Sequence, residues 1–130
     1  MSDTPDAANR PLSPHLQIYW PRGNMIMSIV HRITGVALYA GSALLALWLV
    51  TAAFSPDAFA FVNGVLASWL GRLVLIGFTW AVLHHLIGGL RHLVWDSGRG
   101  FELPTIALMA WGTLALSVVL TAVVWAVAVM

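Results

Sequence analysis

The stretch His84-His85-Leu86-Ile87-Gly88-Gly89-Leu90-Arg91-His92 ends an apolar run that is long enough to cross a membrane as a helix. It carries three histidines and an arginine. Ionisable side chains are costly inside a bilayer and tend to mark a working site there. The stretch therefore predicts a transmembrane helix with a functional site near one of its ends.

A helix over these residues sorts them into two neighbouring stripes, because successive residues turn by about 100°. The stripes hold His85, Gly89, His92 and Asp96, and His84, Gly88, Arg91 and Trp95. On the first stripe an imidazole projects over a surface that a glycine leaves bare, which suits a flat ligand such as a porphyrin. The spacing alone does not choose between the two adjacent histidines.

The composition extends this interpretation to the whole chain. Of 130 residues, 60% are hydrophobic and 8% are charged, whereas about 25% are charged in a soluble domain. The mean hydropathy is +0.87. Three uncharged runs, residues 33–56, 73–90 and 103–130, each approach or exceed the roughly 18 to 20 residues that cross a bilayer. We predict an all-α membrane protein with three transmembrane helices.

The chain lacks the residues that several function classes need. It has no cysteine, so it can hold neither an iron–sulfur cluster nor a disulfide, and redox chemistry must rest on a bound cofactor. It contains no glycine-rich nucleotide-binding motif, and its net charge of +1 argues against a nucleic-acid partner. We therefore expect membrane lipid around the chain and no nucleic-acid partner.

The chain divides into a polar N-terminal arm, residues 1–24, and a transmembrane domain, residues 25–130. The helices are predicted at about residues 25–54, 65–95 and 104–129. Residues 58–71 contain Asn63 and Gly64 and are predicted to form an interfacial turn that leads into the second helix. The arm matches neither a secretory signal nor a transit peptide, which favours an unprocessed protein of the bacterial inner membrane, although a mitochondrial protein whose presequence has been removed would look the same.

The arginines predict the orientation of the chain. Arg10 and Arg22 precede the first helix. Arg91 and Arg99 flank the second loop, and Arg72 alone lies on the opposite side. Cytoplasmic segments carry the excess of arginine and lysine in membrane proteins. The N-terminus and the second loop are therefore expected to face the cytoplasm.

Ser28 and Arg32 form a second candidate site at the cytoplasmic edge of the first helix. They are four residues apart and therefore share one helix face. A hydroxyl and a guanidinium together can bind a carbonyl oxygen or a propionate. His85 lies six residues before Arg91 and therefore about 9 Å deeper in the membrane, at 1.5 Å per residue. The Ser28–Arg32 pair and the histidine stripe thus lie at similar depths on the same side of the membrane.

Each feature also has an ordinary structural explanation. Arg32 and Arg91 could anchor helix ends, and His31 could hydrogen-bond a helix neighbour. Gly88 and Gly89 could permit close helix packing. A ligand site is as strong an interpretation as these structural explanations, because two adjacent histidines are followed by a glycine pair and a third histidine.

Three segments carry a family resemblance. They are Arg10-Pro11-Leu12-Ser13-Pro14-His15-Leu16-Gln17-Ile18-Tyr19, Ser28-Ile29-Val30-His31-Arg32-Ile33-Thr34-Gly35, and His85-Leu86-Ile87-Gly88-Gly89-Leu90-Arg91-His92-Leu93-Val94-Trp95-Asp96. In order and spacing they resemble the cytochrome b556 subunits of succinate dehydrogenase, the larger of that complex's two membrane anchors. The resemblance covers nearly the whole chain from Arg10.

The resemblance implies that the three helices are half of a two-subunit bundle, with haem b between the subunits and one axial histidine from each. It implies that His85 is the haem iron ligand, and that Ser28 and Arg32 belong to a ubiquinone site. It further implies that four residues lie near the haem propionates or the quinone pocket, namely His31, Arg32, Arg91 and His92.

The resemblance also implies the partners. A second membrane anchor supplies the other axial histidine, a flavoprotein subunit oxidises succinate, and an iron–sulfur subunit passes the electrons to ubiquinone at this anchor. We expect no activity from the chain alone and no catalytic residue on it. Two alternatives stay open, namely an anchor of a fumarate reductase-type complex and a small proton-transfer subunit that uses His84, His85 and Arg91 as a relay.

Overall fold

A computed structural model describes residues 11–129, and helices make up most of that part of the chain. The elements are η2 (Leu16–Ile18), α1 (Gly23–Phe54), α2 (Pro56–Ala67), α3 (Trp69–Asp96) and α4 (Leu103–Val129). Among the described residues, three helices are long and apolar enough to span a membrane, namely α1, α3 and α4. The predicted all-α fold with three transmembrane helices is confirmed.

The predicted interfacial turn at residues 58–71 is wrong, because most of it is helical. Helix α2 begins with strong start signals: the Ser55 side chain accepts a hydrogen bond from the Ala58 amide at 3.3 Å, Pro56 occupies the first turn, and Asp57 follows. Asn63 does not break the helix, since its Oδ1 accepts a hydrogen bond from Trp48 Nε1 of α1 at 3.0 Å.

The break between α2 and α3 falls at Ser68. Its hydroxyl oxygen accepts a hydrogen bond from the Gly71 amide at 3.1 Å and so caps the start of α3. The second long helix therefore begins at Trp69 and not near residue 65. A β-carbon at Gly71 would lie 2.3 Å from the Val65 carbonyl oxygen, so this close turn depends on glycine.

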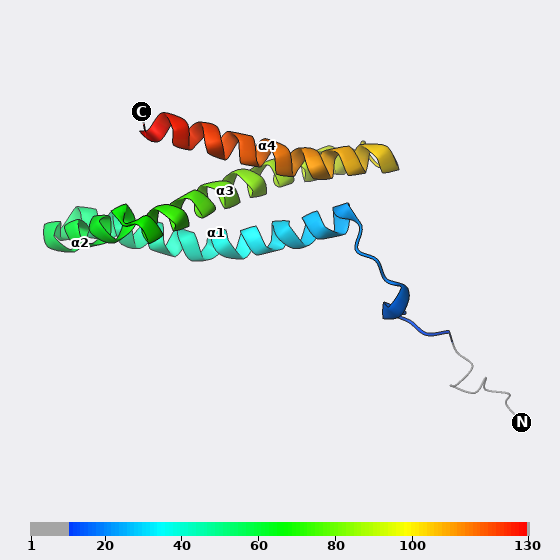
Figure 1. Ribbon diagram of the computed structural model, residues 1–130, viewed down its shortest axis with the longest axis horizontal. Coiled ribbons are helices and arrows are strands. Elements are labelled where there is room, and N and C mark those ends of the chain that lie inside the picture. Colours follow the sequence, from blue (N-terminus) through cyan, green and yellow to red (C-terminus); the bar gives the residue numbers. More distant parts are fainter. Residues whose placement is uncertain (1–10, 130) are drawn as a thin grey trace, which may run out of the picture.

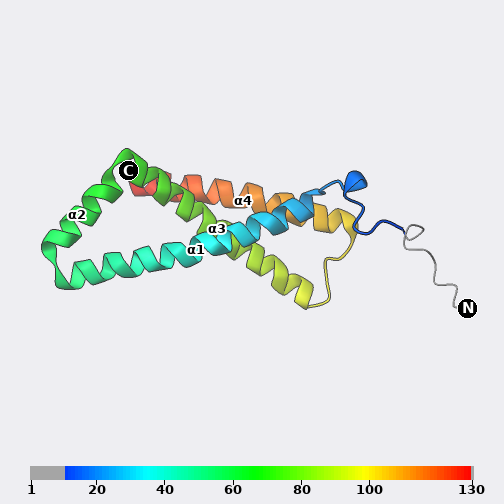
Figure 2. The ribbon, with the colours of Figure 1, turned by 90° about the horizontal axis from the view of Figure 1, so that it is seen from below.

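Helix α3 is the central element of the bundle. It contacts α1 on one side and α4 on another, and it crosses α1 near the middle of both helices (Figures 1 and 2). The arm at residues 11–22 and the connection between α3 and α4 lie at one end of the bundle (Figure 2). Helix α2 and the end of α4 lie at the other, so one end collects the arm, the α3–α4 loop and the start of α1.

Helix α3 ends at Asp96, close to the predicted residue 95, and glycines follow it. Gly98 follows the C-cap Ser97 with φ of +76°, and its amide donates to the Trp95 carbonyl at 2.8 Å. This left-handed conformation is the usual way for a helix to stop at glycine. The Trp95 Nε1 donates to the Gly100 carbonyl at 3.2 Å and holds the loop against the helix.

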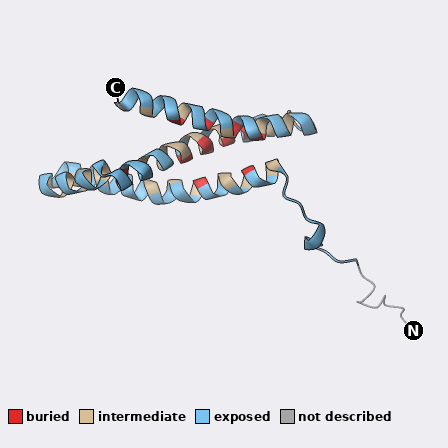
Figure 3. Cartoon of the chain, in the orientation of Figure 1, coloured by how far each residue is buried: buried red, intermediate tan, exposed pale blue. Residues whose placement is uncertain are grey.

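The buried residues lie where the three long helices face one another, and the outward faces are exposed (Figure 3). Buried apolar residues of the described chain are Met27, Ala81 and Ala110, and buried polar ones are Thr34, His84, Arg91, Thr113, Ser117 and Thr121. Hydroxyls on α4 donate to carbonyls of their own helix, as Thr113 does to Met109 at 2.7 Å. The bundle thus has a polar interior and an apolar exterior, as expected of a chain surrounded by lipid.

Candidate functional site

His31 of α1 and His85 of α3 stack face to face where the two helices cross. Their ring centres are 3.9 Å apart, and the ring planes differ by 7°. The His85 Nδ1 lies 3.1 Å from the His31 carbonyl oxygen and 3.3 Å from the Thr34 hydroxyl. The Thr34 hydroxyl itself donates to the His31 carbonyl at 2.8 Å. Groups on one turn of α1 therefore fix the position of the His85 ring.

These contacts determine which nitrogen of His85 can bind a ligand. A carbonyl oxygen only accepts hydrogen bonds, so the Nδ1 that lies against it must carry the ring proton in the neutral imidazole. The Nε2 then keeps a free lone pair, and within the described residues no group forms a hydrogen bond to it. A histidine held through Nδ1 by a backbone carbonyl is the arrangement that metal-binding histidines commonly show.

Glycines make the stack possible. A β-carbon at Gly88 would lie 2.5 Å from the His31 Nδ1, and one at Gly35 would lie 3.1 Å from the His85 Cε1. A larger residue at Gly88 would therefore displace the His31 ring, and one at Gly35 would require the His85 ring to shift by a few tenths of an ångström. At Gly89, in contrast, a β-carbon would meet no atom of the described chain within 4 Å, so the bare helix surface expected beside the histidine stripe is present.

His92 extends the cluster toward the end of α3. Its ring centre lies 5.5 Å from that of His31, and its edge packs at 85° against Trp95 with 5.1 Å between ring centres. His92 is exposed, whereas His31 is half-buried and its Nδ1 is a buried atom with no hydrogen-bond partner in the described chain. His31, His85 and His92 thus form one histidine cluster between α1 and α3.

His84 lies in a different environment from His85. It is 1% exposed and packs between α3 and α4, with its Nδ1 3.2 Å from the Ser117 hydroxyl and its ring 5.1 Å from that of Trp80. Ser117 donates to the Leu114 carbonyl and accepts from the Trp80 Nε1, so it can accept the Nδ1 proton of His84 as well. The two adjacent histidines face different helices, which spacing alone did not resolve.

Ser28 and Arg32 lie one turn apart on α1, as the sequence predicts. Ser28 is half-buried and Arg32 is exposed. In the described part of the chain, neither side chain forms a hydrogen bond or ion pair, so a hydroxyl and a guanidinium remain available on this face. Both are within one turn of His31 along α1, so the pair lies at the same level of the bundle as the histidine cluster.

Arg91 lies on another side of α3 from His85. Six residues after His85, it points about 120° away around the helix. It lines a groove between α3 and α4, is 6% exposed, and stacks over Trp95 at 4.9 Å. The structure therefore brings three of the six predicted site residues into contact, namely His31, His85 and His92. Ser28 and Arg32 share a neighbouring face of α1, and Arg91 lines the groove between α3 and α4.

Two residues of the site were missed by sequence reasoning. Thr34 and Gly35 fix the ring of His85, although neither is ionisable. Thr34 follows His31 by three residues and so shares its helix face, which is the signal that could have revealed it. Gly35 could be recognised only once its partner helix was known.

The cluster has features that fit a haem. No group of three or more histidine, cysteine, aspartate or glutamate side chains in residues 11–129 could hold a bare metal ion. A haem iron needs a single nitrogen from each side, because the porphyrin supplies the other ligands. The free Nε2 of His85 and the bare surface at Gly89 fit that requirement.

The fold and the site together define a small three-span membrane subunit that presents a histidine cluster between two crossing helices. Residues 6–124 match the family described as "Succinate dehydrogenase/Fumarate reductase transmembrane subunit". The chain belongs to this family.

Relatives of similar length support the same assignment. The chain is 50% identical over 112 residues to the succinate dehydrogenase cytochrome b556 subunit of Paracoccus denitrificans, covering 86% of each protein. It is 38% identical over 116 residues to that of Rickettsia bellii, covering 89% of this chain and 90% of the relative. It is 37% identical over 122 residues to the cytochrome b560 subunit of Reclinomonas americana, covering 90% of this chain and 85% of the relative.

Proposed function

We propose that the chain is the larger membrane anchor of a succinate:ubiquinone oxidoreductase and that His85 is an axial ligand of its haem b. The observation that carries this proposal is the contact of His85 Nδ1 with the His31 carbonyl at 3.1 Å, which leaves Nε2 free for iron. The names of the relatives, cytochrome b556 and b560 subunits, support it. A second anchor subunit supplies the other axial histidine.

The residues around His85 have distinct roles in holding the cofactor. Haem b supplies a one-electron redox centre when bound. His31 lies flat against His85 and fixes the angle of its ring, and Gly89 leaves space beside it. Arg32 and His92 are exposed at the same end of the bundle and supply N–H donors for propionates. The predicted contact of Arg91 with the haem stays a prediction.

Ser28 and Arg32 form this chain's part of a ubiquinone site. The Ser28 hydroxyl donates to a quinone carbonyl oxygen, and the Arg32 guanidinium stabilises negative charge that develops there during reduction. In this proposal the electrons come from an iron–sulfur subunit that receives them from a flavoprotein, and the absence of cysteine from the chain agrees with that division of roles. These subunits meet the anchor on the cytoplasmic side of a bacterial inner membrane, where the arm and the α3–α4 loop lie together.

A specific observation argues against the proton-relay alternative. His84 contacts Ser117 of α4, whereas His85 contacts His31 of α1, so the two imidazoles do not form a continuous chain of donors. The fumarate reductase alternative uses the same anchor with the reaction reversed. The flavin subunit and the potential of the quinone decide that direction.

The absorption spectrum of the complete complex tests the proposal. His85→Ala should remove or convert the low-spin haem signal, because it deletes the axial nitrogen. His84→Ala is the matched control, since it changes the neighbouring residue but leaves the stack on α1 intact. Equal losses in both variants, or an unchanged spectrum in His85→Ala, would show that His85 is not the ligand.

A further inference from the structure

Arg91 is a buried cation for which the described chain supplies no anion. Its side chain is 6% exposed, and its Nε and Nη1 atoms are buried with no hydrogen-bond partner among residues 11–129. The stacking contact with Trp95 at 4.9 Å does not satisfy these N–H donors. A buried guanidinium without an acceptor is unfavourable, so an acceptor is expected from outside this part of the chain.

Arg91 lines a groove of about 250 Å³ between α3 and α4. Its apolar walls are formed by Ile87, Leu90 and Val94 of α3 and by Met109, Gly112 and Leu116 of α4. Thr113 also lines it, but its hydroxyl donates to the Met109 carbonyl of its own helix. Arg91 is therefore the ionisable group in an otherwise apolar groove.

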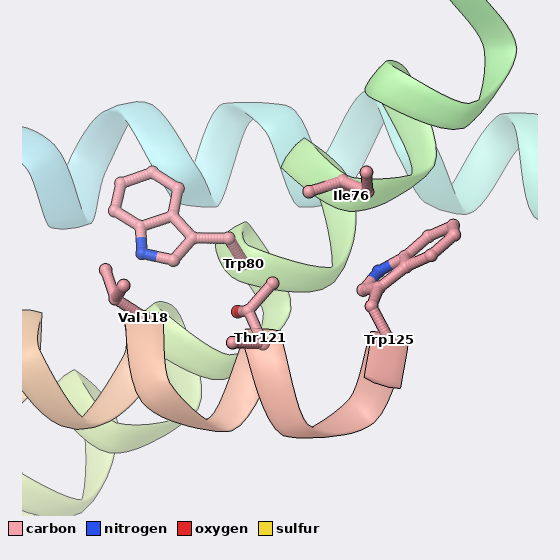
Figure 4. Close-up of a pocket in the computed structure, with 6 residues that line it drawn as sticks. Ile76, Trp80, Val118, Thr121 and Trp125 are labelled. Atoms are coloured by element: carbon pink, nitrogen blue, oxygen red, sulfur yellow. The ribbon is translucent and has the colours of Figure 1, made fainter. Parts of the chain in front are cut away.

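A second hollow between the same helices provides a contrast (Figure 4). It measures about 320 Å³ and is lined by Ile76, Trp80, Val118, Thr121, Ala122 and Trp125. Its two indole N–H groups are already satisfied, since Trp80 donates to Ser117 at 3.1 Å and Trp125 donates to Thr79 at 3.3 Å. Only the groove at Arg91 has both an apolar wall and unsatisfied donors among these two hollows.

The depth of Arg91 in the membrane indicates the kind of ligand. With 28 residues, α3 is about 42 Å long at 1.5 Å per residue, which matches the roughly 40–45 Å of a bilayer with its headgroups. Arg91 lies five residues before the end of α3 at Asp96, or about 7.5 Å inside. Its backbone therefore lies at the edge of the hydrocarbon, from which a long arginine side chain can reach the lipid phosphates of the headgroup layer.

We propose that this groove binds one anionic phospholipid, with its phosphate on Arg91 and an acyl chain along Ile87 and Leu116. A guanidinium matches the charge and geometry of a phosphate, and basic pockets between transmembrane helices are known sites for lipid headgroups. The carboxylate of a partner protein would satisfy the charge but would leave the deeper apolar part of the groove unfilled. The proposal is independent of the haem and quinone roles given above.

The test measures lipid binding to the complete complex in neutral detergent by native mass spectrometry, with phosphatidylglycerol as the titrated probe. Arg91→Gln should weaken retention of one lipid by about ten- to a hundredfold, since it removes a hydrogen bond to a charged group. Arg72→Gln, at the opposite end of α3, should leave retention unchanged. These two variants differ in position but not in chemistry.

A second pair of variants tests the groove without changing any charge. A β-carbon at Gly112 or Gly77 would meet no described atom within 4 Å, so both positions can accept a larger side chain. Gly112→Leu fills the groove and should release the lipid, whereas Gly77→Leu should retain it. This pair keeps the proposal testable even if Arg91→Gln lowers the yield of the complex.

Two outcomes would overturn the proposal. In the first, Arg91→Gln retains the lipid as the unaltered complex does. If this variant then loses the haem signal or releases another subunit, Arg91 is assigned to the cofactor or to a protein partner. In the second outcome, inorganic phosphate displaces phosphatidylglycerol at equal concentration, which indicates a site for the free ion.

Discussion

Replacing Gly88 with alanine is expected to disturb the histidine stack, because the added methyl group has no space. Its carbon would lie 2.5 Å from the His31 Nδ1 and 2.9 Å from the His31 Cε1, whereas atoms in contact lie about 3.5–4.0 Å apart. The His31 ring must therefore move by about 1 Å. It cannot simply retreat, since the His85 ring lies 3.9 Å away.

The size of the effect follows from a matched control on the same helix. Gly77→Ala adds the same methyl group where no described atom lies within 4 Å. Both variants gain up to about 1 kcal/mol from the higher helix propensity of alanine. Overpacking costs about 1–3 kcal/mol, so the two variants should differ in free energy of unfolding by about that amount.

Thermal loss of the haem absorbance in the purified complex measures this difference. We expect a midpoint that is roughly 2–12 °C lower for Gly88→Ala than for Gly77→Ala, together with a shifted spectrum only in Gly88→Ala. The reasoning is refuted if the two variants have the same midpoint and the same spectrum. Such a result would mean that His31 does not pack on Gly88 in the assembled protein.

Three further predictions concern the quinone site, the arm and the cofactor surface. Ser28→Ala should lower quinone-linked succinate oxidation about threefold to tenfold, from a lost hydrogen bond of about 0.5–1.5 kcal/mol, and Arg32→Leu should lower it more. Reduction of an artificial acceptor by the soluble subunits should not change, and a parallel fall in both rates would indicate a role in assembly instead. Deleting residues 10–19 should release the soluble subunits from membranes, because the apolar residues of the arm are exposed and need a partner; full retention with normal quinone reduction would contradict this. Gly89→Leu should lower the haem content without lowering the amount of chain, since its β-carbon has open space in the chain itself, and an unchanged haem content would place the haem elsewhere.

The transmembrane helices could be predicted because each depends on its own composition. A run of apolar residues near 20 in length has few alternatives to a membrane helix, so α1, α3 and α4 follow from the sequence. Helix α2 was missed because Asn63 and Gly64 suggested a turn. The start signals at Ser55 and Pro56 decided the outcome instead, and the Trp48–Asn63 hydrogen bond satisfied the polar group.

The choice between His84 and His85 could not be predicted, because it depends on which neighbouring helix each residue meets. Periodicity places the two histidines on adjacent stripes but does not say which stripe faces α1. The Thr34 hydroxyl and the His31 carbonyl decide this for His85, and Ser117 decides it for His84. The place of Arg91 in a groove between α3 and α4 depends in the same way on the position of α4.

The polar interior of the bundle reverses the usual rule for which positions tolerate mutation. In a water-soluble domain, buried positions accept only apolar residues of similar size, and surface positions accept most polar ones. Here an outward residue such as Leu108, which is 74% exposed, should exchange freely among valine, isoleucine and phenylalanine but not accept lysine. Ser117, which is fully buried, should resist replacement by alanine, because it joins Trp80 and His84. A saturation-mutagenesis map of this chain should therefore show that outward positions require apolar residues and that interior positions require polar ones, which is the reverse of the pattern in a soluble helical bundle.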